Sequence, residues 1–213
     1  MSATSSAALI NNLVQKLKEP LPAKEALSMM FPHIKAMPEE TPTDAKPSAV
    51  MVLLFEKNEE WHVLAIRRTE DGHAHSGQIS FPGGKHELDD ESMLHTALRE
   101  TYEEIGIDAT KINVLGALSP VYIVVSNFNV FPYVGHLQST EAININPEEV
   151  HSILEIPLKE LFHETAKIKT EVVSPAYPDI KRIVNAYQVQ EGAIIWGATA
   201  IMLAELELVL NTQ

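Results

Sequence analysis

The chain has 213 residues, no cysteine and a formal net charge of −13 at neutral pH. This charge disfavours binding to nucleic acid or to an anionic membrane, because both require neutralisation of phosphates. No apolar run reaches the roughly 18 residues of a membrane span, and the N-terminus lacks the basic and apolar regions of a secretory signal. The absence of cysteine excludes disulfides and thiolate metal sites and fits a reducing cytoplasm. We therefore expect a cytoplasmic protein with one sizeable domain or at most two small ones.

The first predicted element is a short amphipathic helix. Three leucines at a spacing of four lie over residues 6–18, the spacing that places side chains on one helix face. A proline-containing connection follows at Met37–Ser48. We therefore expect an N-terminal helical extension over 1–44 and a main domain over 45–213. The extension is a candidate dimer interface, so a homodimer is among the expected assemblies.

The hydrophobic period changes where the main domain begins. Ala49–Phe55 and Trp61–Ile66 are nearly continuous apolar runs with the polar residues Lys57–Glu60 between them, which predicts a buried hairpin. The glycine-containing residues 67–84 are predicted to form a loop, and the pattern over 91–105 predicts a helix. Further strands are predicted at Ile112–Leu118, Val121–Val125, Val130–Val134, Ile153–Ile156, Ile168–Val173, Arg182–Val189 and Ala193–Trp196, a short helix at Pro157–Phe162 and a closing helix at Ala198–Leu210. Interleaved strands and helices without a strict repeat predict an α/β or α+β sandwich.

One stretch concentrates acidic residues. Placing residues 92–105 on a helix sets Glu100, Glu103 and Glu104 within about 100° of each other on one face. A mostly apolar face beside them suits packing on a core. A solvated acidic surface is the ordinary interpretation of such a pattern. However, like charges four residues apart disfavour a helix, and a bound cation would remove that penalty.

The residues before this helix favour the cation. Gly83 and Gly84 permit a close approach of the main chain, and a backbone carbonyl there could complete an oxygen cage. Hard cations such as Mg²⁺ take carboxylate oxygens together with substrate phosphates. Arg99 lies next to Glu100 in the sequence and could hold a carboxylate through bidentate hydrogen bonds. The pattern predicts one or more divalent cations that clamp a phosphate ester.

The same stretch resembles the Nudix box, G-x5-E-x7-R-E-U-x-E-E-x-G-U, in which U is apolar. RETYEEIGI, from Arg99 to Ile107, matches its second half, with Thr101 at the first U position. The first half departs, because the residue that follows Gly84 after five intervening residues is Asp90, an aspartate, and eight residues instead of seven separate it from Arg99. This register is similar to that of the coenzyme A pyrophosphatase subgroup.

Other stretches resemble the same subgroup, over roughly residues 45–208. LAIRRTEDGHAHSGQISFPGG, from Leu64 to Gly84, is similar to the signature upstream of the box. His73 stands where that signature usually has arginine, and Ile66 where it has threonine. SNFNVFPYVG, EVHSILEIPLKEL and WGATA resemble later strands and the last helix of the family.

The resemblance implies a fold, a cofactor and a reaction. The fold would be the Nudix α/β/α sandwich with a mixed sheet, in which the box forms a loop–helix–loop. The cofactor would be Mg²⁺ or Mn²⁺, and the reaction would be attack of water on a nucleoside diphosphate linked to another group. For coenzyme A, the products would be 3′,5′-ADP and 4′-phosphopantetheine.

The resemblance also assigns roles to individual residues. The cation would be held by Glu100, Glu103 and Glu104, with the Gly83 carbonyl as an additional ligand, and Arg99 would orient the glutamates. The base is a choice among Glu100, Glu103 and a downstream acid, for which Glu149 is preferred over Glu148. The expected substrate contacts are Arg68, Arg67, Lys85 and Gln78, and His73, His75 and His86 are further candidates near the box.

Two alternatives remain open. The departures at His73 and Ile66 favour another Nudix hydrolase, acting on ADP-ribose or a dinucleotide. A Nudix fold could also serve as a non-catalytic nucleotide-binding module. The complete set of Arg99, Glu100, Glu103 and Glu104 argues against that module, because a retired site could lose a carboxylate without harm.

Overall fold

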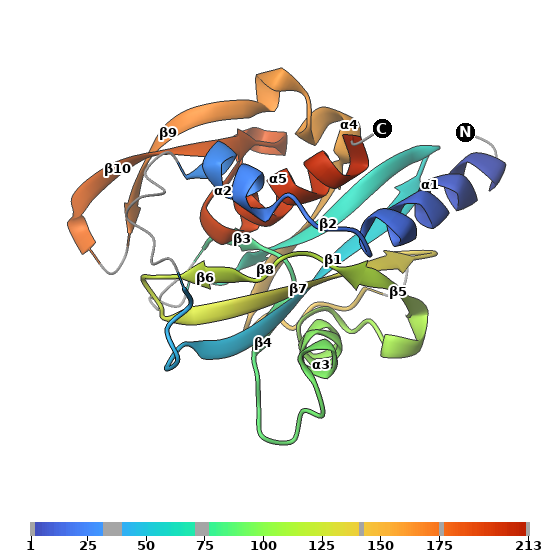
Figure 1. Ribbon diagram of the computed structural model, residues 1–213, viewed down its shortest axis with the longest axis horizontal. Coiled ribbons are helices and arrows are strands. Elements are labelled where there is room, and N and C mark those ends of the chain that lie inside the picture. The colour runs from blue at the N-terminus through green and yellow to red at the C-terminus, as the bar shows by residue number, and fades with distance from the viewer. Residues whose placement is uncertain (1–2, 32–39, 71–76, 141–142, 175–176, 212–213) are drawn as a thin grey trace.

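A mixed β-sheet with helices on both faces forms the centre of the protein (Figure 1). The structure is a computed structural model that describes residues 3–31, 40–70, 77–140, 143–174 and 177–211. The eight-stranded sheet has the order β3-β2-β1-β7-β5, with β4 paired to β1, β6 to β7 and β8 to β2. The strands of this sheet are β1 (Lys46–Lys57), β2 (Glu60–Arg68), β3 (Ile79–Ser80), β4 (Gly83–Lys85), β5 (Ile112–Ala117), β6 (Val121–Ile123), β7 (Phe128–Leu137) and β8 (Val150–Pro157).

A second, three-stranded sheet and the helices complete the fold. This small antiparallel sheet has the order β11-β10-β9. Its strands are β9 (Lys167–Ser174), β10 (Tyr177–Gln188) and β11 (Ile194–Ile195). The helices are α1 (Ala3–Lys16), α2 (Ala23–Met30), α3 (Met93–Ile105), α4 (Leu158–Leu161) and α5 (Gly197–Asn211), with 3₁₀ turns at Ala109–Lys111, Glu164–Ala166 and Gln190–Gly192. None of the described helices is long and apolar enough to cross a membrane.

The predicted hairpin is the centre of the large sheet. β1 and β2 pair antiparallel around Asn58 and Glu59, whose positive φ values of 52° and 64° are those of a tight two-residue hairpin turn. β1 also pairs in parallel with β7, so the sheet is mixed. The predicted α/β sandwich is confirmed.

Alternation along the strands divides the core into two layers. Met51 and Leu53 of β1 pack with Ala97 and Ile105 of α3, whereas the side chains between them face the opposite layer. That opposite layer contains α5 and residues of α1 and α2, including Leu13, which is 1% exposed. Figure 1 shows α3 on one side of the sheet and α1, α2 and α5 on the other. The boundary at residue 44 stays a prediction, but both N-terminal helices contribute to the common core.

The structure differs from the prediction in two places. Residues 67–84 are not all loop, because β2 continues to Arg68 and the short strands β3 and β4 lie within or begin in this range. Both short strands are held by backbone pairing, β3 with β2 and β4 with β1. In addition, α2 was not predicted, because this helix is only eight residues long and offers few turns over which a period can be recognised.

Candidate active site

Helix α3 presents the acidic residues and is fixed at both ends. The Ser92 side chain accepts a hydrogen bond from the His95 backbone N–H at 3.1 Å, the usual N-cap arrangement. Gly106 ends the helix with φ of 72°, a conformation that glycine adopts without strain. The predicted helix and its packed face are therefore confirmed.

Glu104 is a buried acid on this helix. Glu104 is completely buried, with 0% of its surface exposed. Its Oε2 accepts the Gly83 N–H at 2.8 Å, and its Oε1 accepts Arg68 Nη1 at 3.0 Å. Burial raises the pKa of Glu104 to about 7, while the bond from Gly83 and the charge of Arg68 act in the opposite direction. Glu104 therefore joins α3 to β2 and β4.

Glu100 lies against the backbone of β4. A Cβ on Gly84 would overlap the Glu100 carboxyl group in its present position, so a side chain there would displace this carboxylate. Burial raises the pKa of Glu100, Arg99 lowers it, and Glu103 and Glu149 raise it further. The glycine pair thus fits a carboxylate into a space that a side chain would fill.

Arg99 organises the remaining carboxylates. Its guanidinium binds Asp90 in a bidentate manner, with Nε–Oδ1 at 2.9 Å and Nη2–Oδ2 at 3.0 Å. Nη1 reaches Glu103 at 2.7 Å and Nη2 reaches Glu100 at 3.0 Å. Nη2 also donates to the Lys85 carbonyl at 3.0 Å. The predicted bidentate pair therefore exists, but its partner is Asp90.

Asp90 is the residue whose role the sequence did not reveal. It is 7% exposed and accepts the Glu87 N–H at 3.0 Å and the Thr96 hydroxyl at 2.8 Å. The hydrogen bonds from Arg99 hold the pKa of Asp90 well below its usual range, against the effect of burial. Asp90 thereby ties the β4–α3 loop to the helix. Its position as the aspartate of the box was visible in the sequence, but its partner was not.

Two histidines near the box belong to the hydrogen-bond network around Asp90. His86 Nδ1 lies 2.9 Å from the Thr96 hydroxyl, and His95 Nδ1 lies 3.0 Å from Asp90 Oδ1. Both rings therefore help to hold the β4–α3 loop on the helix. His73 and His75, the other two candidates, lie outside the described residues.

Of the two downstream acids, Glu149 is the one whose charge reaches the helix. It raises the pKa of both Glu100 and Glu104. Its Oε1 accepts Asn146 Nδ2 at 3.2 Å, whereas Glu148 is exposed. The structure therefore brings Glu149 into the electrostatic environment of the α3 carboxylates.

The predicted basic residues lie in different places. Arg68 binds Glu104, and the backbone N–H of Arg68 donates to the Gln78 carbonyl at 3.0 Å. Arg67 lies opposite Ile79, which packs in the core layer of α5, so it is on the other face of the sheet from Glu104. The side chain of Lys85 is exposed beside the helix.

The donor set fits a hard divalent cation. Within the described residues, no three acidic or histidine side chains form a ready-made metal cage, since Arg68, Arg99 and Gly83 occupy carboxylate oxygens. Glu103 is nevertheless 48% exposed in its side chain and Glu100 14%, and all the candidate donors are oxygens, the preferred ligands of Mg²⁺. The space above Gly84 allows the carboxylate of Glu100 to lie beside the backbone of β4.

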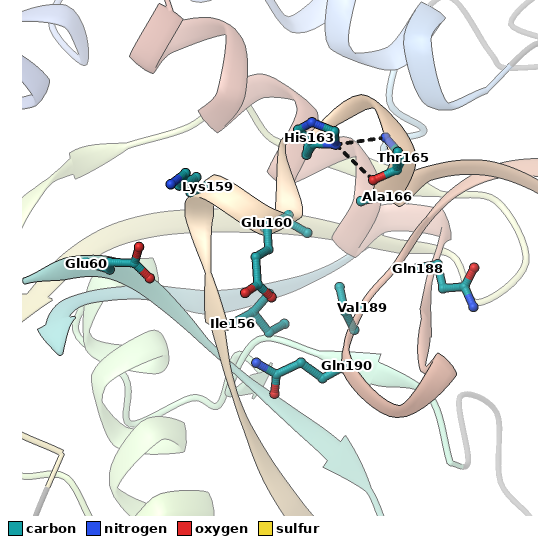
Figure 2. A pocket seen from close by; sticks show the side chains of 11 residues that line it. Glu60, Ile156, Lys159, Glu160, His163, Thr165, Ala166, Gln188, Val189 and Gln190 are labelled. Carbon is teal, nitrogen blue, oxygen red and sulfur yellow. Dashed lines mark hydrogen bonds between the residues drawn. The ribbon is translucent and has the colours of Figure 1, made fainter. Parts of the chain in front are cut away.

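A large cleft lies elsewhere on the protein. It has a volume of about 580 Å³, and Glu60, Glu160, His163 and Gln190 are among the residues that line it. Figure 2 shows His163 hydrogen-bonded to Thr165 at its edge. Glu60, which lines the cleft, begins β2, and Arg68, which binds Glu104, ends it, so these two residues lie about 26 Å apart along that strand. None of the predicted site residues that the structure describes lines this cleft.

The family of this chain follows from its similarity to known proteins. The model of the NUDIX domain matches residues 45–177. The chain belongs to the NUDIX domain family. It is 34% identical over 156 residues to the uncharacterized Nudix hydrolase NudL of Pectobacterium atrosepticum, covering 71% of this chain and 76% of that one. It is 35% identical over 148 residues to NudL of Yersinia pestis strain Pestoides F, covering 68% of this chain and 70% of that one.

A solved structure supports the same fold. The MutT/nudix family protein from Enterococcus faecalis aligns with a TM-score of 0.54 and 18% identity, over 100% of this chain and 76% of that chain. The family match and the curated relatives together assign the chain to the Nudix hydrolases. The carboxylate face of α3 is its candidate active site.

Asp90 provides a test of how the candidate site is held together. In Asp90→Asn, we expect Mn²⁺ affinity to fall by about 10- to 100-fold. This is the usual effect of removing a residue that orients the metal ligands through hydrogen bonds. Asp89→Asn is the matched control, because Asp89 is the exposed neighbour. Mn²⁺ titration by calorimetry measures both, and equal affinity in the two variants would contradict the role of Asp90.

Glu104 predicts an unusual pH dependence of stability. Its pKa in the folded protein is about 7, against 4.5 when unfolded. Between these values the folded state holds a proton that the unfolded state has lost. The stabilisation is therefore complete below 4.5 and is lost as pH rises through 7. Without metal, we expect the free energy of unfolding to fall by up to about 3 kcal/mol over this range.

Urea unfolding with a chelator at a series of pH values measures this effect. Glu104→Gln should flatten the slope relative to the natural protein. If the slope is the same in both, the burial of Glu104 is not its source.

Proposed function

We propose that this Nudix hydrolase uses Mg²⁺ or Mn²⁺ to cleave the diphosphate of coenzyme A or its derivatives to 3′,5′-ADP and 4′-phosphopantetheine. One observation carries the proposal. The segment Leu64–Gly84, which resembles the coenzyme A subgroup, contacts two of the α3 carboxylates directly. Arg68 and Gly83 bind Glu104, and Gly84 makes room for Glu100.

The cation would be held by Glu100, Glu103 and Glu104, with the Gly83 carbonyl as a further ligand. Its chemistry would be to neutralise the diphosphate, lower the pKa of a bound water and stabilise charge on the leaving phosphate. Arg99 already holds Glu100 and Glu103 near each other. This arrangement limits the rearrangement needed when the cation arrives.

The base that accepts the proton from water is one of Glu100, Glu103 and Glu149. Glu104 is unsuited to this step, because both of its oxygens already accept hydrogen bonds and it is fully buried. Glu149 gains support from its electrostatic effect on Glu100 and Glu104.

The substrate phosphates would meet the basic side chains near the carboxylates. Arg68 is the leading candidate, since its side chain is 30% exposed while it binds Glu104 and could turn toward a phosphate. Lys85 extends into solvent beside α3, and Gln78 is held next to Arg68 through the backbone. Arg67 is the weakest candidate, because it lies on the opposite face of the sheet.

The alternative substrate is ADP-ribose or another nucleoside diphosphate derivative. The departures from the subgroup signature at Ile66 and His73 are the observations that favour it. Ile66 is 0% exposed and packs in the core under α3, so this departure concerns packing rather than substrate contact. The alternative therefore depends on His73, and a non-catalytic binding module remains the third and weakest candidate.

A substrate panel tests the proposal. With Mg²⁺ or Mn²⁺, purified protein should convert coenzyme A to 3′,5′-ADP and 4′-phosphopantetheine, read by mass spectrometry. Glu103→Gln should reduce kcat/KM by about a hundredfold or more. Glu91→Gln is the matched control and should leave it unchanged, since Glu91 is exposed before the helix.

The other outcomes separate the alternatives. The coenzyme A assignment is wrong if kcat/KM for ADP-ribose or a dinucleotide exceeds that for coenzyme A by more than about a hundredfold. The Nudix chemistry would still hold in that case. Nucleotide binding without turnover of any diphosphate would favour the binding module.

A further inference from the structure

The small sheet ends in an open strand edge. Within the described residues, β9 pairs with β10 on one side and with no strand on the other. Figure 1 shows β9 along the upper margin of the molecule. The unpaired N–H and C=O groups of such an edge are a template for another strand.

Around the middle of β9, the charged side chains at matching positions are opposite in sign and the apolar ones are similar in shape. The strand reads Lys167-Ile-Lys-Thr-Glu-Val-Val-Ser. On either side of Thr170 stand Lys169 and Glu171, which have opposite charges, and beyond them stand Ile168 and Val172, which are both β-branched. A strand of this kind is complementary to a reversed copy of itself.

We propose that β9 pairs antiparallel with β9 of a second copy of this chain, across a two-fold axis at Thr170. Each Lys169 then lies opposite Glu171 of the second copy, and each Ile168 lies opposite Val172. Opposite charges and β-branched pairs directly across an antiparallel ladder are both favourable. Because a two-fold interface repeats every contact, each pair occurs twice. The two small sheets would join into one sheet of six strands.

The register follows from the pleat and the charges. Residues directly opposite each other in an antiparallel pair lie on the same face, so the axis must pass at a residue. An axis at Lys169 would place two lysines opposite each other, and an axis at Glu171 would place two glutamates opposite each other. Like charges in that position are destabilising. Among these neighbouring registers, the one centred on Thr170 avoids both.

The surroundings of Glu171 favour the same contact. Glu171 binds Lys181 of its own β10 at 2.7 Å, so Lys169 of the second copy would complete a row of alternating charges. On the same face, Val173 is 46% exposed and Ile183, opposite Glu171, is 66% exposed. Of these two, Val173 lies on the edge strand itself and gains burial when a second strand is added. Lysines on an edge strand can prevent pairing, but here alternation with glutamate penalises the wrong registers instead.

Charge reversal tests the pairing. In sedimentation velocity over a wide range of concentration, we expect the natural chain to dimerise and Lys169→Glu and Glu171→Lys to be monomers when each is alone. Mixed together, these two variants should form a heterodimer. The two introduced side chains then lie opposite each other with opposite charges, and the unchanged Glu171 of one variant lies opposite the unchanged Lys169 of the other.

The control for charge reversal lies outside the strand. Glu19 is exposed and does not belong to β9, so Glu19→Lys should dimerise as the natural chain does. It changes the net charge by the same amount as Glu171→Lys. Thermal unfolding checks that every variant is folded.

A single cysteine tests the register. The chain has no cysteine, so Thr170→Cys introduces the only thiol. Residues at the two-fold axis have Cβ atoms about 5 Å apart, so mild oxidation should link two Thr170→Cys chains covalently. Two Val172→Cys chains should not become linked, because residue 172 of each chain lies opposite Ile168 of the other.

Three results would overturn the proposal. The first is a natural chain that stays monomeric at every concentration. The second is failure of the charge-reversal test, either because a dimer survives each single reversal or because the two variants do not associate when mixed. The third is cross-linking through Val172→Cys that equals or exceeds that through Thr170→Cys.

Discussion

The crowding of carboxylates on α3 is the constraint on which the candidate site depends. Glu100, Glu103 and Glu104 share a helix face, and Glu104 is fully buried. A buried carboxylate without partners is costly, so the surrounding elements supply partners. β2 contributes Arg68, β4 contributes the Gly83 N–H, and α3 itself contributes Arg99. The packing of the hairpin, the short strand and the helix therefore serves the same group of charges.

Two arginines neutralise different members of this group of acids. Arg68 fixes the innermost carboxylate, whereas Arg99 joins Asp90 of the loop to the outer carboxylates Glu100 and Glu103. The outer pair remains partly exposed, so it can meet a cation and a diphosphate from solvent. The overall acidity of the chain does not prevent binding of an anionic substrate, provided that the cation provides the local positive charge.

The sequence predicted those elements that carry a strong hydrophobic signal. The hairpin at β1 and β2 was found from its two apolar runs, and the helix α3 from apolar residues that repeat every 3.6 residues. β4 was missed because Gly83 and Gly84 carry no hydrophobic signal, and its pairing with β1 is a tertiary contact. The helical arrangement placed Glu104 closest to the apolar face, yet only the structure shows that it is fully buried and bound to Arg68. The Asp90–Arg99 pair could not be predicted, because it depends on how the β4–α3 loop folds back.

The most direct test is a crystal structure determined with Mn²⁺ and a non-hydrolysable diphosphate analogue. Anomalous scattering would locate the metal independently of its ligands. The proposed metal site requires at least one Mn²⁺ within coordination distance of oxygens from Glu100 and Glu103 and of the analogue. Mn²⁺ bound elsewhere with the analogue, while the α3 carboxylates keep only their arginine partners, would contradict it.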